Sequence, residues 1–355
     1  MIRPHPQGTA PFVLSVLDNA ITGEGHTAQE SFAGVIDLAR TADRRGFERF
    51  WMSEHHAMPG ASTSSPQLMV ARLIGETERI RLGAGGIMLP NHVPLVIAEQ
   101  FGMLEALAPG RIDLGLGRAP GTDGATAAAL RRHQGANEQF PDQVDELFAF
   151  LEDTHPPEHP YGRVHAVPGP WQSEQNHVTG SDSLPQIWIL GSSVYSAQLA
   201  ARLGRPYAFA LQFGSADVVS AMQIYREQFR PSVVLADPYS LLSIGTIALD
   251  DPAEARRQAS TSAMGMMRMF LGQGFSIPHP DDVERMASGV REGQFIREWT
   301  ERTLHGTAAD VAHGLEALHQ HTQVDEVMLV TGGHSREVHT RTLELIADHY
   351  SLPEV

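Results

Sequence analysis

The sequence predicts an α/β protein built as a single eight-stranded β/α (TIM) barrel with insertions. Short apolar runs alternate along the chain with segments whose apolar residues recur at helical spacing, which is typical of a parallel sheet. Most of the short runs are apolar on both faces, as buried parallel strands should be. Eight strand and helix pairs in one chain favour a closed barrel, with an open doubly wound sheet as the alternative.

Eight segments have the length and composition of buried strands. They are residues 12–17, 49–53, 82–88, 112–117, 187–191, 206–211, 241–249 and 326–331. Helices are expected between them, for example at 95–108 and 308–321, where one stripe is apolar. The first helix carries the stripe Phe32, Val35, Ile36, Ala39 and Ala42, and Gly46 is placed to end it.

Two stretches interrupt this rhythm. Residues 154–184 are rich in Pro, His and Gly, and residues 272–306 are polar with a helix expected near 281–286. Long excursions in a barrel are usually active-site walls or lids. We therefore expect one domain over residues 1–355, with insertions near 154–184 and 272–306 that serve this purpose.

The composition excludes several classes of function. Hydrophobic residues at 42% and charged residues at 19% are globular values. The formal net charge of −16 repels phosphate backbones and anionic lipid headgroups, so we expect neither a nucleic-acid nor a membrane partner. Cysteine is absent, which excludes disulfides and cysteine nucleophiles. No long apolar run opens the sequence, and the cytoplasm is the expected location.

The run Glu54-His55-His56 follows the second predicted strand, and barrel active sites lie at such C-terminal strand ends. Histidine is the usual proton carrier near neutral pH, so one imidazole facing the barrel mouth is a candidate catalytic group. The alternative is a structural histidine hydrogen-bonded to Glu54. His92, after the third strand, could complete a metal site, but HExxH spacing is missing and we expect no metal.

Glycines and an arginine at the next strand ends indicate a ligand. Gly85 and Gly86 lie inside a predicted strand, which suggests close approach by a ligand or unusual backbone geometry, with a simple bulge as the alternative. Arg118 directly follows a strand and is suited to a phosphate. The glycine run that ends at Gly121 does not have the spacing of a dinucleotide fingerprint, because its last glycine is one position late.

Two further positions could bind an anion. Ser192 and Ser193 stand between a strand and a helix, where hydroxyls and backbone amides can form an anion site or the serines can simply cap the helix. The run Thr331-Gly332-Gly333 follows the last strand, which is the general preference for phosphate sites in barrels. These alternatives stay open on the pattern alone.

Three motifs occur together and in order: FWMSEHH at residues 50–56, GGIMLPNHVP at 85–94 and GRIDLGLGR at 110–118. In this combination the chain resembles the bacterial luciferase-like flavin monooxygenase family. The likeness is strongest over residues 12–121 and continues through 187–193. The family is a β/α barrel with an insertion before its last strand and helix pair, in agreement with the excursion at 272–306.

The resemblance implies roles for individual residues. His55 would be the catalytic imidazole, and Gly85-Gly86 would span a non-proline cis peptide beneath the flavin ring. Arg118 and Ser192 would contact the FMN phosphate, which overrides the preference for residues 331–333. The full cofactor set that we predict is Gly85, Gly86, Gly117, Arg118, Gly191, Ser192 and Ser193.

The resemblance also implies the reaction, in which reduced FMN and dioxygen oxygenate a small organic substrate. No NAD(P)H site is visible in the sequence, so a separate NAD(P)H-dependent flavin reductase is expected to supply reduced FMN. A homodimer is also implied. Gly117 replaces the cysteine that luciferases use near the ring, so light emission is not supported. The alternatives are a deazaflavin-dependent reductase or dehydrogenase, and a flavin-binding protein without turnover.

Overall fold

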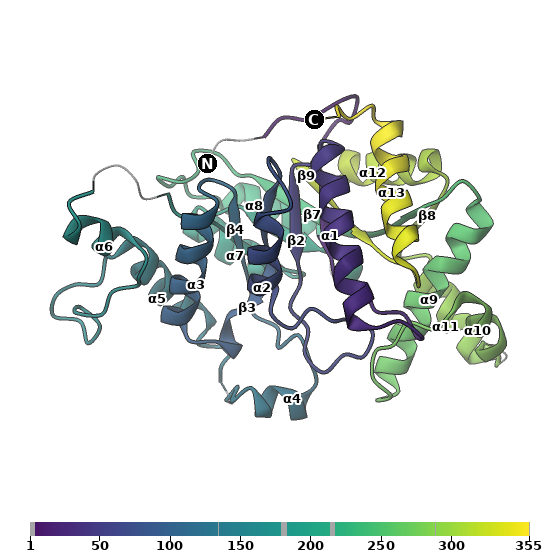
Figure 1. Cartoon of the computed structure of the whole chain (residues 1–355), viewed down its shortest axis with the longest axis horizontal. Coiled ribbons are helices and arrows are strands. Elements are labelled where there is room, and N and C mark those ends of the chain that lie inside the picture. The colour runs from purple at the N-terminus through teal and green to yellow at the C-terminus, as the bar shows by residue number, and fades with distance from the viewer. Residues whose placement is uncertain (1–3, 134, 179–182, 214–216, 288, 355) are drawn as a thin grey trace.

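Eight parallel strands close into a ring in the computed structural model, which describes residues 4–133, 135–178, 183–213, 217–287 and 289–354 (Figure 1). Neighbouring strands follow the chain order, and the ring closes because the last strand pairs with both the first strand and the seventh. The ring consists of β1 Val13–Asp18, β2 Arg49–Met52, β3 Arg81–Met88, β4 Ile112–Gly117, β5 Gln186–Gly191, β6 Tyr207–Ala210, β7 Ser240–Ala248 and β9 Glu326–Thr331. All eight predicted strands are therefore confirmed, and the open sheet is wrong.

A ninth strand was not predicted. The short β8 (Leu304–Gly306) pairs only with the end of β7 and lies outside the ring. Three residues inside a polar stretch carry too little apolar pattern to be recognised as a strand.

Helices surround the strand ring (Figure 1). The α-helices are α1 Ala28–Arg44, α2 Pro66–Ile74, α3 Pro94–Leu107, α4 Gly124–Ala129, α5 Phe140–Glu152, α6 Pro170–Gln175, α7 Val194–Leu203, α8 Val218–Gln228, α9 Pro252–Phe270, α10 Pro280–Met286, α11 Val290–Thr300, α12 Ala308–Thr322 and α13 Arg336–His349. Two short 3-10 helices, η1 Leu89–Asn91 and η2 Leu211–Phe213, follow β3 and β6. Within the described residues, none of the helices combines the length and apolarity needed to cross a bilayer.

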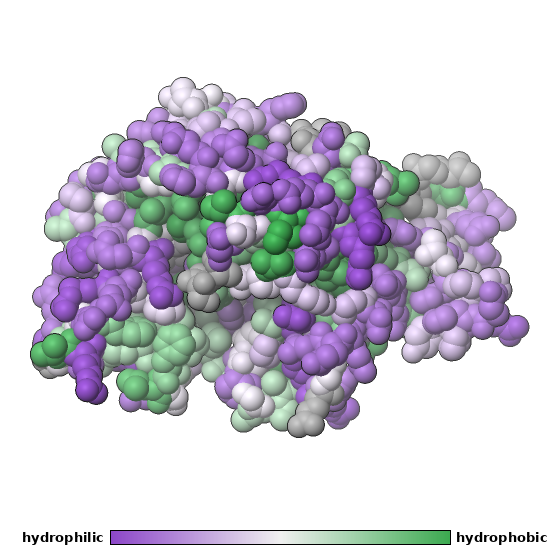
Figure 2. All heavy atoms as spheres, turned by 180° about the vertical axis from the view of Figure 1, so that it is seen from behind, coloured by the Kyte–Doolittle hydropathy of each residue, from purple (hydrophilic) through white to green (hydrophobic). Residues whose placement is uncertain are grey.

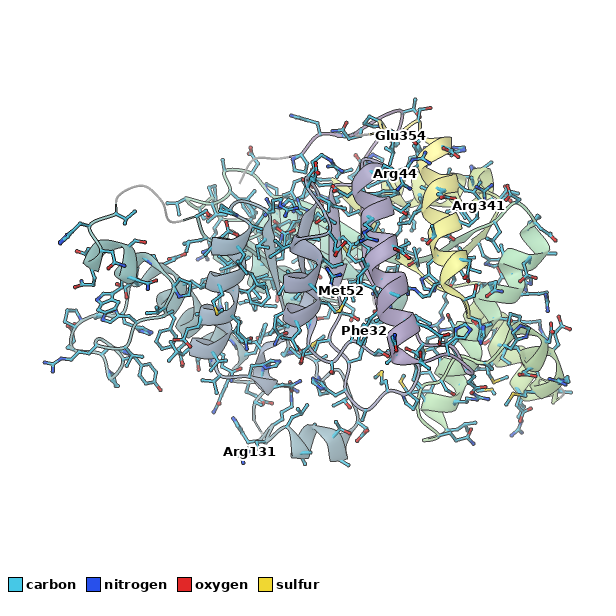
Figure 3. The ribbon with its side chains drawn as sticks, in the orientation of Figure 1. Phe32, Arg44, Met52, Arg131, Arg341 and Glu354 are labelled. Carbon is cyan, nitrogen blue, oxygen red and sulfur yellow. The ribbon has the colours of Figure 1, made fainter. Side chains whose placement is uncertain are left out.

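Helix α1 illustrates how the sequence sets these elements. Thr27 and Glu30 form a reciprocal capping box at its start, and Gly46 follows its end with a φ of 79°. Val35, Ala39 and Ala42 of the predicted stripe are buried against the strands. Figure 3 shows Phe32 and Arg44 toward opposite ends of this helix, with Phe32 on the side where α4 lies. Because helices run against the strands, the C-terminal strand ends face the α4 side, which we call the mouth.

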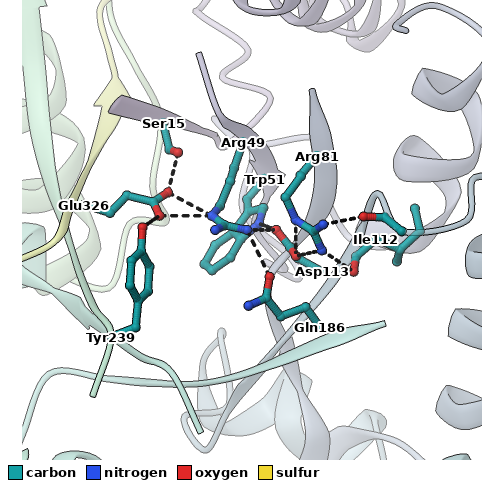
Figure 4. Close-up of polar contacts among 10 residues, drawn as sticks. Ser15, Arg49, Trp51, Arg81, Ile112, Asp113, Gln186, Tyr239 and Glu326 are labelled. Carbon is teal, nitrogen blue, oxygen red and sulfur yellow. Dashed lines mark hydrogen bonds and ion pairs between the residues drawn. The ribbon is translucent and has the colours of Figure 1, made fainter. Parts of the chain in front are cut away.

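The opposite end of the barrel, the base, is closed by a buried polar network (Figure 4). The Arg49 guanidinium lies 2.9 Å from a carboxylate oxygen of Glu326 and 2.9 Å from one of Asp113. Trp51 Nε1 also donates to Asp113, and the Tyr239 hydroxyl donates to Glu326. All five side chains are buried. The base is therefore filled by paired side chains, so we look for a ligand site at the mouth.

Toward the mouth, the inward positions carry small residues. Arg49 and Trp51 point inward at the base, so alternation along β2 places Ser53 inward above them. A Cβ atom at Gly85 would lie 2.5 Å from the Trp51 ring, and one at Gly115 would lie 2.6 Å from Leu190. Glycine is present at these positions because the Trp51 ring and the Leu190 side chain fill the space beside them.

The described residues of the first excursion, 154–178 and 183–184, lie at the base of the barrel and not at its mouth. This excursion joins the C-terminal end of α5 to the start of β5, whereas mouth loops join strands to the helices that follow them. It packs instead on α3, where a Cβ atom at Gly102 would lie 2.5 Å from the Pro168 carbonyl oxygen. The expectation of an active-site wall is therefore wrong for its described residues.

The second excursion, 272–306, begins at the mouth. The Gly60 amide, in the loop after β2, donates to the Phe275 carbonyl at 2.8 Å, and the Glu24 amide, in the loop after β1, donates to the Ile277 carbonyl at 2.8 Å. The helix expected near 281–286 is α10, and α11 was not predicted. Residues 275–277, which we call the lid segment, are thus hydrogen-bonded to two loops of the mouth.

Candidate active site

Glu54 is the centre of a hydrogen-bonded cluster at the mouth. Its carboxylate is fully buried and accepts from four donors on the loops after β2 and β3. They are the Met88 amide (3.0 Å), Asn91 Nδ2 (3.2 Å), His92 Nε2 (2.9 Å) and His56 Nε2 (3.0 Å). Burial alone would raise the pKa of Glu54, but the bonds from His92, His56 and Met88 outweigh it and hold the pKa below its ordinary value. The carboxylate is ionised.

His55 is distinct from its two histidine neighbours in this cluster. Its backbone amide donates to the Thr63 carbonyl at 2.8 Å, which fixes the strand end, and its side chain is partly buried. Nδ1 is buried and has no hydrogen-bond partner in the described part of the chain. Burial lowers the pKa of His55, and the Gly121 backbone and the Glu54 carboxylate oppose this only in part. The imidazole is neutral near pH 7 and retains bonding capacity toward a ligand.

The structural alternative for the Glu54-His55-His56 run applies to its last residue. His56, and not His55, makes the hydrogen bond to Glu54. Of the three residues, the one predicted to be catalytic is not the one whose ring bonds to Glu54.

The Gly85–Gly86 peptide bond is cis, as the resemblance implies. The pairing of β3 with β4 shifts by one residue between Gly85 and Ile87. A Cβ atom at Gly86 would lie 2.7 Å from the Gly115 carbonyl oxygen, and one at Gly117 would lie 2.9 Å from Met88 Sδ. A side chain is therefore excluded at Gly86 by backbone of the barrel wall, whereas at Gly117 it would displace the Met88 side chain.

Arg118 lies against the first turn of α7. Its guanidinium carbon is 4.2 Å from the centroid of the Tyr195 ring, one turn from Ser192 and Ser193. Ser193 occupies the N-cap position of α7, yet its hydroxyl makes no capping bond, so the simple capping alternative is not realised. Gly191 faces Ser196, whose Oγ would be 2.2 Å from an added Cβ atom. The predicted phosphate-binding residues are thus brought together.

At the competing phosphate position after β9, the hydroxyl of Thr331 already has a hydrogen-bond partner. The Thr331 hydroxyl is buried and lies 2.9 Å from His339 Nδ1. A buried hydroxyl that already bonds a histidine is poorly placed to bind a phosphate.

Arg132 was missed by the sequence reasoning, and Asn91 was placed in the 85–94 motif without a role of its own. Arg132 donates to Asn91 Oδ1 at 2.8 Å, to Asn137 Oδ1 at 2.6 Å and to the Arg118 carbonyl. Asn91 in turn donates to Glu54 and to the Pro120 carbonyl. Arg132 follows α4 in a loop without a recognisable motif, so nothing in its local sequence indicates that it reaches the mouth.

The mouth shows no metal site among the described residues, because no group of three or more His, Asp or Glu side chains there could hold an ion. His56 and His92 share Glu54 instead. Figure 2, which views the molecule from behind, shows its lower edge hollowed between the lobe of α9 to α11 and the lobe of α4. The cluster around Glu54 and the Arg118 site belong to loops on this edge.

Known proteins are similar to this chain in sequence and in fold. A relative from Escherichia coli (strain K12) named luciferase-like monooxygenase is 38% identical over 94% of this chain and 96% of its own. An N-acetyl-S-alkylcysteine monooxygenase from Bacillus subtilis (strain 168) is also 38% identical, over 90% and 92%. The crystal structure of apo-MsnO8 matches with a TM-score of 0.84 and 32% identity, covering 97% of this chain and 99% of that one.

More distant structures share the fold alone. One is the oxygenating constituent of 3,6-diketocamphane monooxygenase in complex with FMN, at 18% identity and a TM-score of 0.70. Another is an F420-dependent secondary alcohol dehydrogenase, at 13% identity and 0.68. The family model described as luciferase-like monooxygenase matches residues 13–332. Together with the barrel and the conserved length of its relatives, this match means that the chain belongs to the luciferase-like monooxygenase family.

Proposed function

We propose that the protein is an FMN-dependent monooxygenase that oxygenates a small organic substrate with reduced FMN and dioxygen. One atom of dioxygen enters the substrate, and the other leaves as water while reduced FMN is oxidised. The observation that carries the proposal is that Arg118, Ser192 and Ser193 lie on the same rim as His55. The Ser193 hydroxyl makes no capping bond to α7, and His55 Nδ1 has no partner among the described residues.

The residues present fit FMN. Arg118 offers a guanidinium for which no carboxylate partner occurs among the described residues, and Ser192 and Ser193 offer hydroxyls at the N-terminus of α7. The side-chain-free positions Gly85, Gly86 and Gly117 would lie along the flavin ring, and Gly191 would lie beside the phosphate. Bound reduced flavin supplies electrons that activate dioxygen.

His55 and the lid segment have separate tasks in this proposal. A neutral imidazole can hold or move a proton at Nδ1 during oxygen transfer, and its lowered pKa keeps it neutral at pH 7. Residues 275–277, fastened across the loops after β1 and β2, would limit the entry of water. Glu54 stays out of the proton transfer because its carboxylate is already saturated with donors.

A separate flavin reductase that uses NAD(P)H is part of the proposal, because an oxygenase of this kind needs reduced FMN. We also propose that the protein acts in the cytoplasm. A homodimer is also proposed. Its support is a set of apolar side chains left exposed on α2 and α3, namely Leu68, Val96, Met103 and Leu107.

Titration of apoprotein with FMN and, separately, with the deazaflavin F420 tests the cofactor. We expect quenching of FMN fluorescence with saturable binding and weaker binding of F420. Preference for F420 would favour the deazaflavin-dependent alternative. With reduced FMN supplied by a reductase, N-acetyl-S-alkylcysteines are the first substrates to test, since a relative is named for them. Flavin binding without oxygenation of any substrate panel would favour the non-catalytic alternative.

A further inference from the structure

Glu54 bonds to several segments of the proposed cofactor site at once. Through the Met88 amide it holds the end of β3, which follows the Gly85–Gly86 peptide. Through Asn91 it connects to Arg132, which donates to the Arg118 carbonyl. His55 is its neighbour in sequence. One buried carboxylate thus joins the ring side of the site to the phosphate side.

The hydrogen-bond partners fix the chemical form of this carboxylate. Arg132 can only donate, so Asn91 must present Oδ1 to Arg132 and therefore Nδ2 to Glu54. The Met88 amide is also an obligatory donor, and it faces the other oxygen of Glu54. Both carboxylate oxygens must accept, because each faces a group that cannot. An amide nitrogen in place of either oxygen would place a hydrogen against one of these donors.

We propose that Glu54 is the positioning residue of the cofactor site, holding the ring-side segment 85–88 and the Arg118 loop in one fixed relation. This inference rests on the proposed FMN-dependent function. It assigns separate effects to two groups of residues. Glu54 acts on both sides of the flavin, whereas Asn91 and Arg132 act only on the phosphate side.

Glu54→Gln tests this assignment because it keeps the shape of the side chain and removes one of the two acceptors. Apoprotein titrated with FMN should show an affinity lower by about tenfold, as expected when a buried donor is left unsatisfied. At saturating FMN, the visible circular dichroism of the bound flavin should also change, because the segment along the ring has lost its anchor at Met88. A general loss of stability would not alter the spectrum of the flavin that remains bound.

Asn91→Ala and Arg132→Ala should weaken FMN binding but leave that spectrum like the parent's. Combining Asn91→Ala with Glu54→Gln should weaken binding by about the sum of the two single effects, because Met88 and Asn91 bond to different oxygens of Glu54. Arg131→Ala is the matched control. This substitution removes the same charge as Arg132→Ala, one position earlier in the chain. Figure 3 shows Arg131 at the outer tip of the α4 segment, pointing away from the barrel.

FMN affinity within twofold of the parent and an unchanged spectrum in folded Glu54→Gln would overturn the inference. Equal losses in Arg131→Ala and Arg132→Ala would also overturn it, since they would indicate a general charge effect. If Glu54→Gln does not fold, the Asn91 and Arg132 variants still decide whether the chain to Arg118 matters. Parent apoprotein that binds no FMN would instead refute the proposed function, and with it this inference.

Discussion

The guanidinium of Arg118 lies over the ring of Tyr195, with 4.2 Å between the guanidinium carbon and the ring centroid. The two residues come from different parts of the barrel, the loop after β4 and the first turn of α7. Stacking on an aromatic ring leaves the guanidinium N–H groups available in the plane, where they can bind an oxyanion in two-pronged fashion. The contact therefore orients Arg118 without saturating it.

Arg118→Ala should weaken FMN binding by about 1.5–3 kcal/mol, the range for a lost hydrogen bond to a charged group. Fluorescence titration of apoprotein measures this. Arg118→Lys should recover only part of the loss, because an ammonium group cannot stack or bind two oxygens in the same way. Unchanged FMN affinity in Arg118→Ala would remove the phosphate assignment.

His55→Ala should retain FMN affinity, since the phosphate-binding residues lie on other loops. Oxygenation should fall by about two to four orders of magnitude, as expected for a lost general acid or base. In the parent, kcat/KM should decline only below pH 6.5, because the pKa of His55 is lowered and the neutral form persists to more acidic pH. Oxygenation at the parent rate would reduce His55 to a structural residue.

The barrel was predictable because its strands are continuous apolar runs and its helices carry one apolar stripe. The positions of Glu54, His55 and Arg118 directly after strands were predictable for the same reason. Arg132 was not, because its contacts with Asn91 and Arg118 depend on how a loop without a motif folds back over the mouth. Chain order alone could have predicted that residues 154–184 belong to the base of the barrel. They follow a helix and precede a strand, whereas mouth loops follow a strand.

Arg49→Leu should destabilise the protein strongly. Arg49 is the only arginine that contacts both Glu326 and Asp113 within the described residues, and its loss leaves buried negative charge without full compensation. Breaking a buried ion pair on one side costs about 3–5 kcal/mol. Arg40→Leu, which removes exposed pairs with Glu76 and Asp37, should destabilise the protein far less, because water already screens these charges. Urea unfolding of both variants measures the difference, and similar values would contradict the role of the base network.

Met103→Lys should dissociate the proposed homodimer. The Met103 side chain is 55% exposed on α3, and a charge there would have to be buried in an interface. Light scattering should return twice 38.7 kDa for the parent and a single chain for the variant. Phe270→Lys, at a residue 62% exposed on α9, is the control and should leave the dimer intact. A monomeric parent would refute the dimer.

His339 should make the protein less stable as the pH falls. The side chain is fully buried, Nδ1 lies 2.9 Å from the Thr331 hydroxyl, and Nε2 has no partner among the described residues. Burial, together with the charge of Arg336, lowers the pKa of His339 to about 3, against an ordinary value of 6.5. At pH values between these two pKa values, His339 binds a proton in the unfolded chain but not in the folded protein. The free energy of unfolding therefore falls as the pH drops from 6.5 toward 3.

The contribution of His339 to this loss should be about 2 kcal/mol between pH 7 and pH 5. His339→Asn keeps an amide group that can bond to Thr331 but cannot titrate, so the stability of the variant should decline less over the same range. Urea unfolding of the parent and the variant at pH 7, 6 and 5 gives the difference directly, because all other titrating groups are common to both. The variant can be less stable than the parent at pH 7 through lost packing. A gap between the two proteins that stays constant from pH 7 to pH 5 would show that His339 does not titrate in this way.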